Sequence, residues 1–350
     1  MPNKTFSLLY IGNKLTKHGK TPTSVDTLST QFEELFNVIS VSDKLNLFFR
    51  MYDIVSSIIK RRKRVDAILI DTYSSLNFYI AIISVFLAKS LGIDYYLYLH
   101  GGNLPSRLKK NPRLSAYLFN NSKKNIAPSG YLQDAFSKEG YQTEFIPNNI
   151  DISLYPFIHR ESVSPKILYV RAFSKVYNPQ MAIKAFKCIF DEYPEATMCM
   201  VGPDKDGTLE VCKNLCLNLG IDKAVEFTGK LEKKEWISRS KEFDIFVNPT
   251  NADNQPVSII EAMALGLVIV STNAGGLPYL INDRKDGLLC KVNDDKQMAS
   301  CIKQLLEDKE LASNLSKNAF IKADSYSWKN VKNSWEELFL KNRKSDNYDT

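Results

Sequence analysis

The sequence has few residues of the kinds that bind metals or build disulfide frameworks. Its 350 residues include only three histidines and six cysteines. No histidine lies near Cys212 or Cys216, which are one helical turn apart. The apolar run from Phe6 to Ile11 is short and has no small-residue cleavage site after it, so no secretory signal is expected. Reduced, buried thiols are therefore predicted, with no zinc-type cluster.

Long hydrophobic runs are also missing. The longest extends from Leu76 to Ala88 and is interrupted by Asn77 and Ser84. It is too short to span a membrane and is typical of a buried helix. The sequence has no internal repeat, and its length suits two α/β domains. These features predict a cytoplasmic protein.

Positive charge is concentrated in the first part of the chain. Residues 1–150 contain 19 Lys and Arg against 11 Asp and Glu, whereas the whole chain has 46 against 39. The basic run from Lys60 to Arg64 follows the apolar and aromatic stretch from Leu45 to Tyr52. Such a pairing favours an anionic membrane surface. An ordinary amphipathic helix with a solvated basic end explains it equally well. No motif for nucleic-acid binding is present.

A site for a phosphorylated ligand is predicted between Asp253 and Glu261. The two acids are eight residues apart and bracket Pro256, which can open a helix because its missing N–H would be unpaired there anyway. The N–H groups of Val257 and Ser258 would then lie at the positive end of the helix dipole. A diphosphate is the natural anion for this position.

The rest of the segment suits the sugar part of a nucleotide-sugar. Glu261 comes one turn later and could accept hydrogen bonds from ribose hydroxyls, while Asp253 could hold hydroxyls of the transferred sugar. Gly275 and Gly276 would let the backbone approach the ligand closely. A helix start and turn in any doubly wound domain is the alternative reading.

This segment resembles the signature of retaining glycosyltransferases of family four, which have the GT-B architecture. The matching residues are Glu261-Ala262-Met263-Ala264, Gly266, Val268-Ile269-Val270 and Gly275-Gly276. The sequence departs from the family at Asp253, where Glu is usual. The resemblance implies retention through front-face attack, in which the leaving phosphate takes the acceptor proton. It also implies that no metal and no cofactor are needed.

The order of elements predicts an α/β protein with two Rossmann-like, doubly wound domains facing across a cleft, as in GT-B enzymes. We expect an acceptor-binding domain over residues 1–155 and a nucleotide-sugar-binding domain over residues 156–327. The final helix, residues 328–341, is expected to cross back onto the first domain. The strands are expected at residues 6–11, 67–70, 95–99, 125–128, 144–146, 166–171, 197–201, 225–228 and 244–248.

Ligands of such sheets bind at the carboxyl ends of strands. The chain places the loop near Gly19 and the residues His100, Arg171, Gly202 and Asp253 directly after expected strands. Candidate site residues therefore gather at one edge of each sheet.

Two of the candidate positions carry positive charge that could offset the charge of a leaving diphosphate. These are Arg171 and Lys175. By resemblance, His100 would face the donor sugar, although a histidine satisfied within the core is the alternative. Gly19 would lie in the turn over the diphosphate, or simply in a surface loop.

The expected function is transfer of a sugar from a UDP- or GDP-sugar to a glycan or polyprenyl-linked acceptor in the synthesis of a cell-surface polysaccharide. The enzyme would be cytoplasmic, with possible attachment to the inner face of the membrane. Two rivals stay open: a non-catalytic nucleotide-sugar-binding protein, and another GT-B enzyme such as a sugar-nucleotide epimerase. A phosphorylase would need a pyridoxal lysine site, which the sequence does not reveal.

Overall fold

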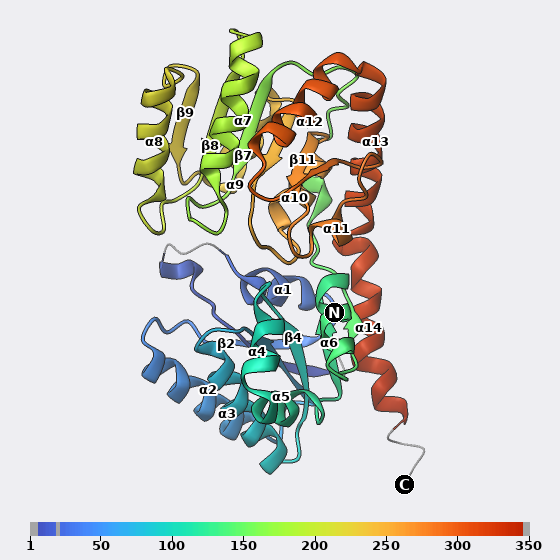
Figure 1. Cartoon of the computed structure of the whole chain (residues 1–350). Helices are drawn as coiled ribbons and strands as arrows, with labels where there is room; N and C mark the ends of the chain where they lie inside the picture. Colours follow the sequence, from blue (N-terminus) through green and yellow to red (C-terminus); the bar gives the residue numbers. More distant parts are fainter. Residues whose placement is uncertain (1–5, 19–21, 346–350) are drawn as a thin grey trace. The chain divides into compact units, whose positions relative to one another are not determined.

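The computed structural model describes residues 6–18 and 22–345, with side chains up to residue 340. It is an α/β protein, as predicted, and contains two six-stranded sheets in two compact units. The first unit comprises Met1–Pro147 and Lys332–Thr350, and the second comprises Asn148–Val331. Figure 1 shows helices around each sheet.

The first unit has a wholly parallel sheet in the order β2-β1-β3-β4-β5-β6. All six residues of β3 are buried, as expected for a strand covered by helices on both faces. The strands are β1 (Ser7–Ile11), β2 (Asn37–Val41), β3 (Ala67–Thr72), β4 (Asp94–Leu99), β5 (Lys124–Ala127) and β6 (Glu144–Phe145).

The helices of the first unit include several that the sequence pattern missed. The strand β2 and the short helices α4 and α5 were not predicted. The helices are α1 (Ser24–Phe32), α2 (Leu47–Arg61), α3 (Asn77–Ser90), α4 (Leu104–Lys110), α5 (Pro112–Phe119) and α6 (Gly130–Lys138), with the 3₁₀ turn η1 (Thr16–His18).

The helix α2 begins where the sequence supplies a good cap. The side chain of Asn46 accepts hydrogen bonds from the N–H groups of Phe48 and Phe49 at 2.9 and 3.3 Å. These are donors that the first turn of a helix leaves unpaired, so the cap fixes the start of α2.

The second unit also has a parallel sheet, in the order β12-β11-β10-β7-β8-β9. Its strands are β7 (Lys166–Val170), β8 (Thr197–Val201), β9 (Val225–Gly229), β10 (Ile245–Asn248), β11 (Val268–Thr272) and β12 (Leu288–Cys290). Its helices are α7 (Pro179–Glu192), α8 (Thr208–Leu219), α9 (Lys233–Arg239), α10 (Val257–Ala264), α11 (Leu277–Leu280), α12 (Asp295–Glu307) and α13 (Lys309–Ser325), with the 3₁₀ turns η2 (Ile152–Leu154) and η3 (Ser240–Glu242).

The cysteines lie mostly in the core of the second unit. All six are free thiols, and all but Cys188 are buried. Burial raises the pKa of Cys212 to about 12, with smaller contributions from Cys216 and Asp204. These thiols therefore stay protonated and pack as small hydrophobic groups.

The chain passes from the first unit to the second between Pro147 and Asn148. Residues 148–155, which the sequence analysis assigned to the first domain, thus belong to the second unit. Two contacts explain this placement: Ile150 pairs with Ser327, and the hydroxyl of Tyr155 bonds to Glu261.

The helix α14 (Trp328–Ser345) belongs to both units. From Lys332 onward it packs in the first unit, where the Trp335 ring contacts Phe32 and Tyr98 with centroids 5.0 and 5.3 Å apart. The apolar stripe that the sequence predicted on this helix is buried throughout. Its members are Trp328, Val331, Trp335, Leu338 and Phe339.

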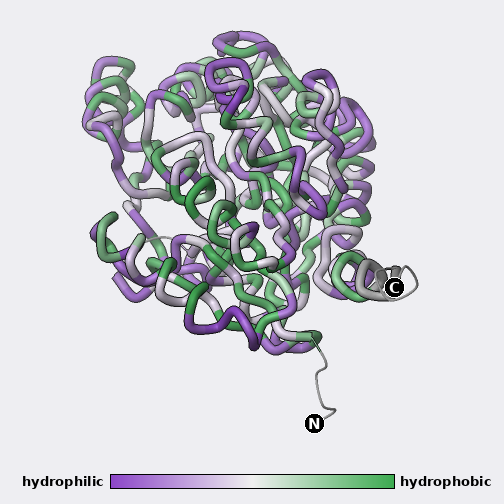
Figure 2. Tube along the Cα trace, turned by 90° about the horizontal axis from the view of Figure 1, so that it is seen from below, coloured by the Kyte–Doolittle hydropathy of each residue, from purple (hydrophilic) through white to green (hydrophobic). Residues whose placement is uncertain are grey.

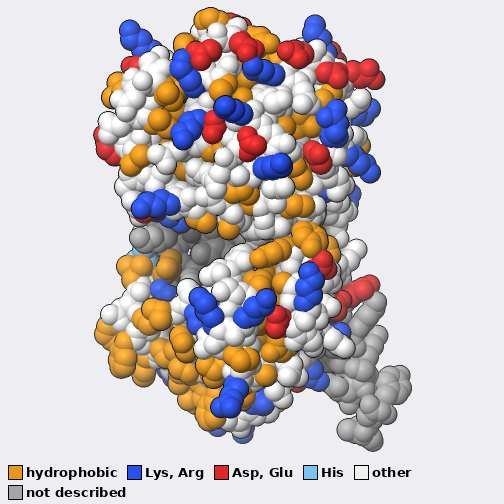
Figure 3. All heavy atoms as spheres, viewed as in Figure 1, with side chains coloured by type: hydrophobic (Ala, Val, Ile, Leu, Met, Phe, Trp, Pro, Cys, Tyr) orange, Lys and Arg blue, Asp and Glu red, His pale blue; other side chains and the backbone are white. Residues whose placement is uncertain are grey.

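The helix α3 differs from the expectation of a fully buried helix. Its inner residues Phe78 and Val85 are buried, but Leu76 just before it and Phe86 are 65% and 59% exposed. Hydrophobic and hydrophilic residues are interleaved along the trace, as the green and purple segments of Figure 2 show. The space-filling view instead shows hydrophobic side chains gathered over the α2 and α3 region (Figure 3).

Candidate functional site

In the second unit, Arg171 and Asp253 form an ion pair. Arg171 follows β7 and Asp253 lies in the loop after β10, and these strands are neighbours in the sheet. The distance from Nη2 of Arg171 to Oδ2 of Asp253 is 2.5 Å. Parallel strands bring the residues after their carboxyl ends together, as the sequence analysis expected. The two residues were assigned to different parts of the donor, but here they bind each other.

The surroundings of Arg171 keep its charge. Its guanidinium lies over the ring of Tyr177, 4.3 Å from the centroid. Burial favours loss of the charge, but Asp253 and Tyr177 outweigh burial and raise the pKa of Arg171 above its ordinary value. Within the described residues, its Nε atom is buried without a hydrogen-bond partner. Arg171 is therefore a fixed cation with donor capacity left.

The glycine pair holds the loop that carries Asp253. The N–H of Gly276 donates to the carbonyl of Asp253 at 3.0 Å. A Cβ atom at Gly275 would lie 2.3 Å from that carbonyl oxygen, and one at Gly276 would lie 1.9 Å from the carbonyl oxygen of Asn254. The close neighbour of these glycines within the chain is thus the 253–254 backbone, and their expected approach to a ligand stays a prediction. A side chain at either glycine would displace the loop that carries Asp253.

The helix α10 begins at Val257, one residue later than expected, so Pro256 is its cap. The carbonyl of Pro256 accepts the N–H of Ile259 at 3.1 Å. The first turn contains no acidic residue, so the positive end of the helix is not neutralised from within. The N–H groups of Val257 and Ser258 lie at this end, which suits an anion.

Glu261 is tied to two residues that the sequence analysis did not single out. The hydroxyl of Tyr155 donates to its Oε1 at 2.6 Å, and Nζ of Lys233 lies 2.7 Å from the same oxygen. Glu261 is only 6% exposed. Burial and the nearby Glu261 carboxylate raise the pKa of Tyr155 above its ordinary value. No sequence pattern marks Tyr155 or Lys233, because their roles come from tertiary contact.

The remaining candidate residues, Lys175 and Gly202, make other contacts in the second unit. The N–H of Lys175 donates to Asp206 at 3.0 Å, and its exposed ammonium has no ion pair within the described residues. Gly202 lets β7 and β8 end close together, since a Cβ atom there would lie 2.0 Å from the carbonyl oxygen of Arg171. Gly19 lies outside the described residues.

In the first unit, His100 is bound to Asp71. Its Nε2 lies 2.8 Å from Oδ1 of Asp71, and both residues are buried. The hydroxyl of Tyr10 donates to the same oxygen at 2.9 Å. The His100 ring stacks on Tyr73 and meets the edge of Tyr98. The partner of this histidine is thus a side-chain carboxylate, which the sequence analysis did not anticipate.

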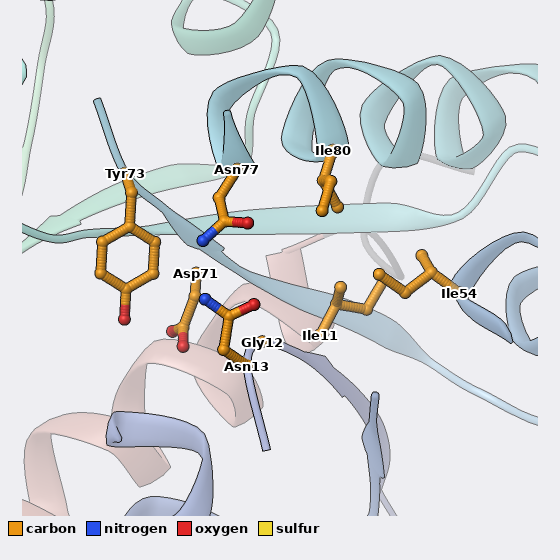
Figure 4. Close-up of a pocket in the computed structure, with 8 residues that line it drawn as sticks. All are labelled: Ile11, Gly12, Asn13, Ile54, Asp71, Tyr73, Asn77 and Ile80. Carbon is orange, nitrogen blue, oxygen red and sulfur yellow. The ribbon is translucent and has the colours of Figure 1, made fainter. Parts of the chain in front are cut away.

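The other oxygen of Asp71 faces a small pocket. Within the described residues, Oδ2 is buried and has no hydrogen-bond partner. A Cβ atom at Gly12 would lie 2.5 Å from it, so only glycine leaves this oxygen room. Figure 4 shows Asp71 beside Tyr73 and two asparagines. The pocket is lined by Ile11, Gly12, Asn13, Ile54, Asp71, Tyr73, Asn77 and Ile80. A carboxylate oxygen in this position accepts a hydroxyl group readily.

The described residues offer neither a cluster of metal ligands nor a helix that could span a membrane. Residues 6–18 and 22–345 contain no group of three or more His, Cys, Asp or Glu side chains that could hold a metal ion. In the same part of the chain, no helix combines the length and the apolar character needed to cross a membrane.

The sequence of the second unit matches a known family. Residues 155–322 fit the family model described as glycosyl transferases group 1. This range contains Arg171, Asp253 and Glu261 together with the sheet that positions them. The second unit is therefore similar to the group 1 glycosyltransferases, which agrees at this broader level with the resemblance found in the sequence.

Curated relatives are similar over the same region. N-acetyl-alpha-D-glucosaminyl L-malate synthase of Bacillus anthracis is 35% identical over 162 residues, which are 45% of this chain and 40% of that protein. D-inositol 3-phosphate glycosyltransferase of Corynebacterium urealyticum is 26% identical over 183 residues, 51% of this chain and 43% of that protein. The matches thus span about two fifths of the length of these relatives.

Solved structures resemble the chain over nearly its whole length. Sucrose-phosphate synthase of Thermosynechococcus elongatus has a TM-score of 0.80 at 14% identity, covering 97% of this chain and 100% of that one. HepE of Anabaena, in complex with UDP, has a TM-score of 0.75 at 15% identity, covering 95% and 99%. At these identities the likeness concerns the fold, and it confirms the predicted GT-B architecture.

Proposed function

We propose that the chain is a glycosyltransferase that moves a sugar from a nucleotide-sugar to a hydroxyl of its acceptor, with retention of the anomeric configuration. The observation that carries the proposal is the convergence of Arg171, Asp253 and the start of α10 after neighbouring strands. A guanidinium and unpaired helix amides suit a diphosphate. The carboxylate beside them suits sugar hydroxyls.

The donor is proposed to be a UDP- or GDP-sugar bound by the second unit. Structures of Anabaena HepE, which has a similar fold, contain UDP or UDP-glucose. In the bound state, Arg171 would donate hydrogen bonds to the phosphates as well as to Asp253. Lys175 would add a second cation. Charge that grows on the leaving diphosphate is then offset where it develops.

The proposed chemistry needs no carboxylate nucleophile. Both candidate acids are engaged, Asp253 with Arg171 and Glu261 with Tyr155 and Lys233. The acceptor oxygen would bond to the anomeric carbon on the face that the phosphate leaves. The bond from that carbon to the phosphate oxygen breaks, and the acceptor proton passes to the phosphate. The basic residues and helix amides would take the place of a metal ion.

The acceptor is proposed to be a glycan or a polyprenyl-linked glycan, as in the synthesis of a cell-surface polysaccharide. The pocket of the first unit supports a hydroxyl-bearing ligand, because the Oδ2 atom of Asp71 is a buried acceptor with no partner within the described residues. His100 would hold the carboxylate in place through its bond to Oδ1. The protein would act on the cytoplasmic side of the membrane.

The proposal is tested by nucleotide binding and donor hydrolysis. UDP, GDP and ADP are each added to the protein in a thermal-shift assay, because a ligand at about 100 times its Kd stabilises the folded state by about 2.7 kcal/mol. Sugar-nucleotides with the stabilising base are then incubated without acceptor. Slow release of free sugar supports a competent enzyme, and a protein stabilised by no nucleotide would refute the proposal.

A non-catalytic nucleotide-sugar-binding protein is the second candidate. The internal pairing of Arg171 with Asp253 favours it, since the two charges neutralise each other without a ligand. Under this alternative the nucleotide still raises the melting temperature, but neither hydrolysis nor transfer is detected with any sugar. An epimerase would instead convert the sugar while it is still attached to the nucleotide.

A further inference from the structure

The helix α2 has a second apolar face, turned away from the core. Phe48 and Tyr52 are 76% and 68% exposed, and Ile59 is 41% exposed. At about 100° per residue, these three positions lie along one line of the helix. The buried residues Ile54 and Ile58 point to the opposite side, into the core of the first unit. An ordinary surface helix would present polar residues outward here.

The neighbouring helix α3 repeats this arrangement. Leu76, Tyr79, Ile83 and Phe86 are all exposed, at spacings of three to four residues that form one stripe. Lys89 is the only charged residue from Asn77 to Ser90. A helix that is apolar on all sides is expected to be covered on all sides.

The outer faces of the two helices form what we call the α2–α3 apolar patch. It is defined by Phe48, Phe49, Tyr52, Leu76, Tyr79 and Phe86, all of them exposed. The two helices share one hydrophobic core on their inner sides. Figure 3 shows hydrophobic side chains gathered over this part of the first unit. Large exposed apolar patches mark interaction sites.

The charge around the patch indicates what covers it. Residues 44–90 contain eight Lys and Arg but only three acidic residues, and one of the acids, Asp71, is buried. Lys60, Arg62, Lys63 and Arg64 are exposed just after the outer stripe of α2. A second copy of the same face would bring like charges together. An anionic lipid surface instead complements the charge and accepts aromatic side chains at the depth of its headgroups.

We propose that the α2–α3 apolar patch rests on an anionic lipid bilayer, with the basic run 60–64 on its phosphates. The patch residues enter the lipid–water interface, while the inner faces of the same helices stay packed in the core of the first unit. The inference stands apart from the proposed sugar transfer, because it concerns the surface of the first unit and is measured without any nucleotide. Binding to lipid and binding of donor can therefore fail separately.

The test is flotation of the full chain with vesicles. We expect the protein to float with vesicles of phosphatidylglycerol and phosphatidylcholine at low salt, and far less with phosphatidylcholine alone. Salt at about 1 M shortens the screening length to about 3 Å, so it should release the protein. Absence of binding to anionic vesicles at low salt would overturn the proposal.

The apolar contribution is tested by a triple variant, Phe48→Ser, Tyr52→Ser and Phe86→Ser. Because all three side chains are exposed, circular dichroism and the melting temperature should stay close to those of the parent. We expect at least a tenfold loss in partition to anionic vesicles. The matched control exchanges three exposed apolar residues of the second unit and should bind like the parent. They are Val211, Leu217 and Ile321, each changed to Ser.

The charge contribution is tested by Lys60→Glu, Arg62→Glu and Lys63→Glu in one chain. Each basic residue near an anionic surface contributes about 1 kcal/mol, so the three reversals should lower partition roughly a hundredfold or more. The control reverses Lys234, Lys296 and Lys317, which are exposed in the second unit. Equal losses in variant and control would show that net charge alone drives binding and would contradict a defined surface.

A protein partner for the patch gives a different result. If a second copy covers it, light scattering detects a dimer that the serine triple variant converts to a monomer, and vesicles do not bind the dimer. That outcome would replace the membrane with a homodimer interface. Vesicle binding that is unchanged in the serine triple variant would also remove the patch from the membrane contact.

Discussion

Tyr155 donates a hydrogen bond to Oε1 of Glu261 at 2.6 Å, and Lys233 approaches the same oxygen at 2.7 Å. The segment that leads into the second unit thereby fixes the side chain of Glu261, which lies just after the first turn of α10. Glu261 is thus part of a buried network as well as a candidate ligand of the donor ribose. A change at either residue is expected to affect folding and nucleotide binding together.

The exchange Tyr155→Phe should lower the free energy of unfolding by about 1.5–3 kcal/mol, because it removes a hydrogen bond to a charged group. Urea unfolding of the full chain measures this change. Tyr193→Phe serves as the control, since the Tyr193 hydroxyl makes no hydrogen bond within the described part of the chain, and this exchange should cost less than about 0.5 kcal/mol. Equal stability of Tyr155→Phe and the parent would show that the bond contributes nothing in solution.

The exchange Glu261→Ala should abolish most sugar transfer while the protein stays folded. The pair with Lys233 is half-exposed on the lysine side, so its loss alone should cost about 1 kcal/mol or less. Activity assays are therefore made well below the melting temperature of the variant. Near-normal turnover by a folded variant would remove Glu261 from the site.

The exchange Arg171→Ala should weaken binding of the nucleoside diphosphate at least about tenfold, while binding of the nucleoside stays the same. Calorimetric titration with both ligands measures the difference. The control is Lys296→Ala, an exposed cation of the second unit. Unchanged diphosphate affinity in Arg171→Ala would place the guanidinium outside the phosphate site.

Two substitutions of Asp253 distinguish its role as partner of Arg171 from its proposed role as ligand of sugar hydroxyls. Asp253→Asn removes the negative charge beside Arg171, so it should bind the free nucleoside diphosphate at least as tightly as the parent, yet transfer sugar poorly. Asp253→Glu should keep activity, since the longer acid is usual in the family that the segment resembles. An inactive Glu variant beside a fully active Asn variant would contradict the hydroxyl-ligand role.

Asp71→Asn should reduce transfer to the acceptor and leave the affinity for nucleotide unchanged, because Asp71 lies in the first unit and Arg171 in the second. Donor hydrolysis without acceptor should also persist. Asp53→Asn, an acid on α2 outside the pocket, is the control. Equal loss of hydrolysis and transfer in Asp71→Asn would point to a structural role for the acid.

The stability of the chain should fall steeply above about pH 10. Burial raises the pKa of Tyr10, Tyr98 and Tyr155 above the ordinary value, helped by Asp71 for the first two and by Glu261 for the third. A phenol with a raised pKa in the folded state stays protonated there but loses its proton in the unfolded state above about pH 10. The stabilisation is therefore present below that pH and is lost as the pH rises. The ultraviolet absorbance of phenolate should show a fraction of tyrosines that ionises only on unfolding.

Alternation of apolar runs and helical periodicity was enough to predict both sheets. The fully buried strands β3 and β10 are short runs dominated by apolar residues, which is why they were predicted. The strand β2 was missed because Asn37 is exposed and its next three residues are only half-buried, so the apolar signal is weak. The helices α4 and α5 were missed because they are short and meet at Asn111 and Pro112.

The site was predicted in its residues but less well in its contacts. Asp253, Glu261 and Arg171 stood out because they surround a helix start or follow a strand. The two contacts of Glu261 are with Tyr155, 106 residues away in sequence, and with Lys233, 28 residues away. Only the folded chain brings these residues together. Asp71 carries a weak signal, an acid at the end of a buried strand, that could have been read alongside His100.

The division of α14 between the two units bears on the order in which the chain can fold during synthesis. The second unit is one continuous stretch, Asn148–Val331, whereas the first needs residues from both ends of the chain. The aromatic cluster around Phe32 lacks Trp335 and Phe339 until α14 has left the ribosome. Domains generally mature in the order of their synthesis. Here the order is reversed: the later unit can reach its final packing first, and the earlier one must wait for α14 with part of its core open.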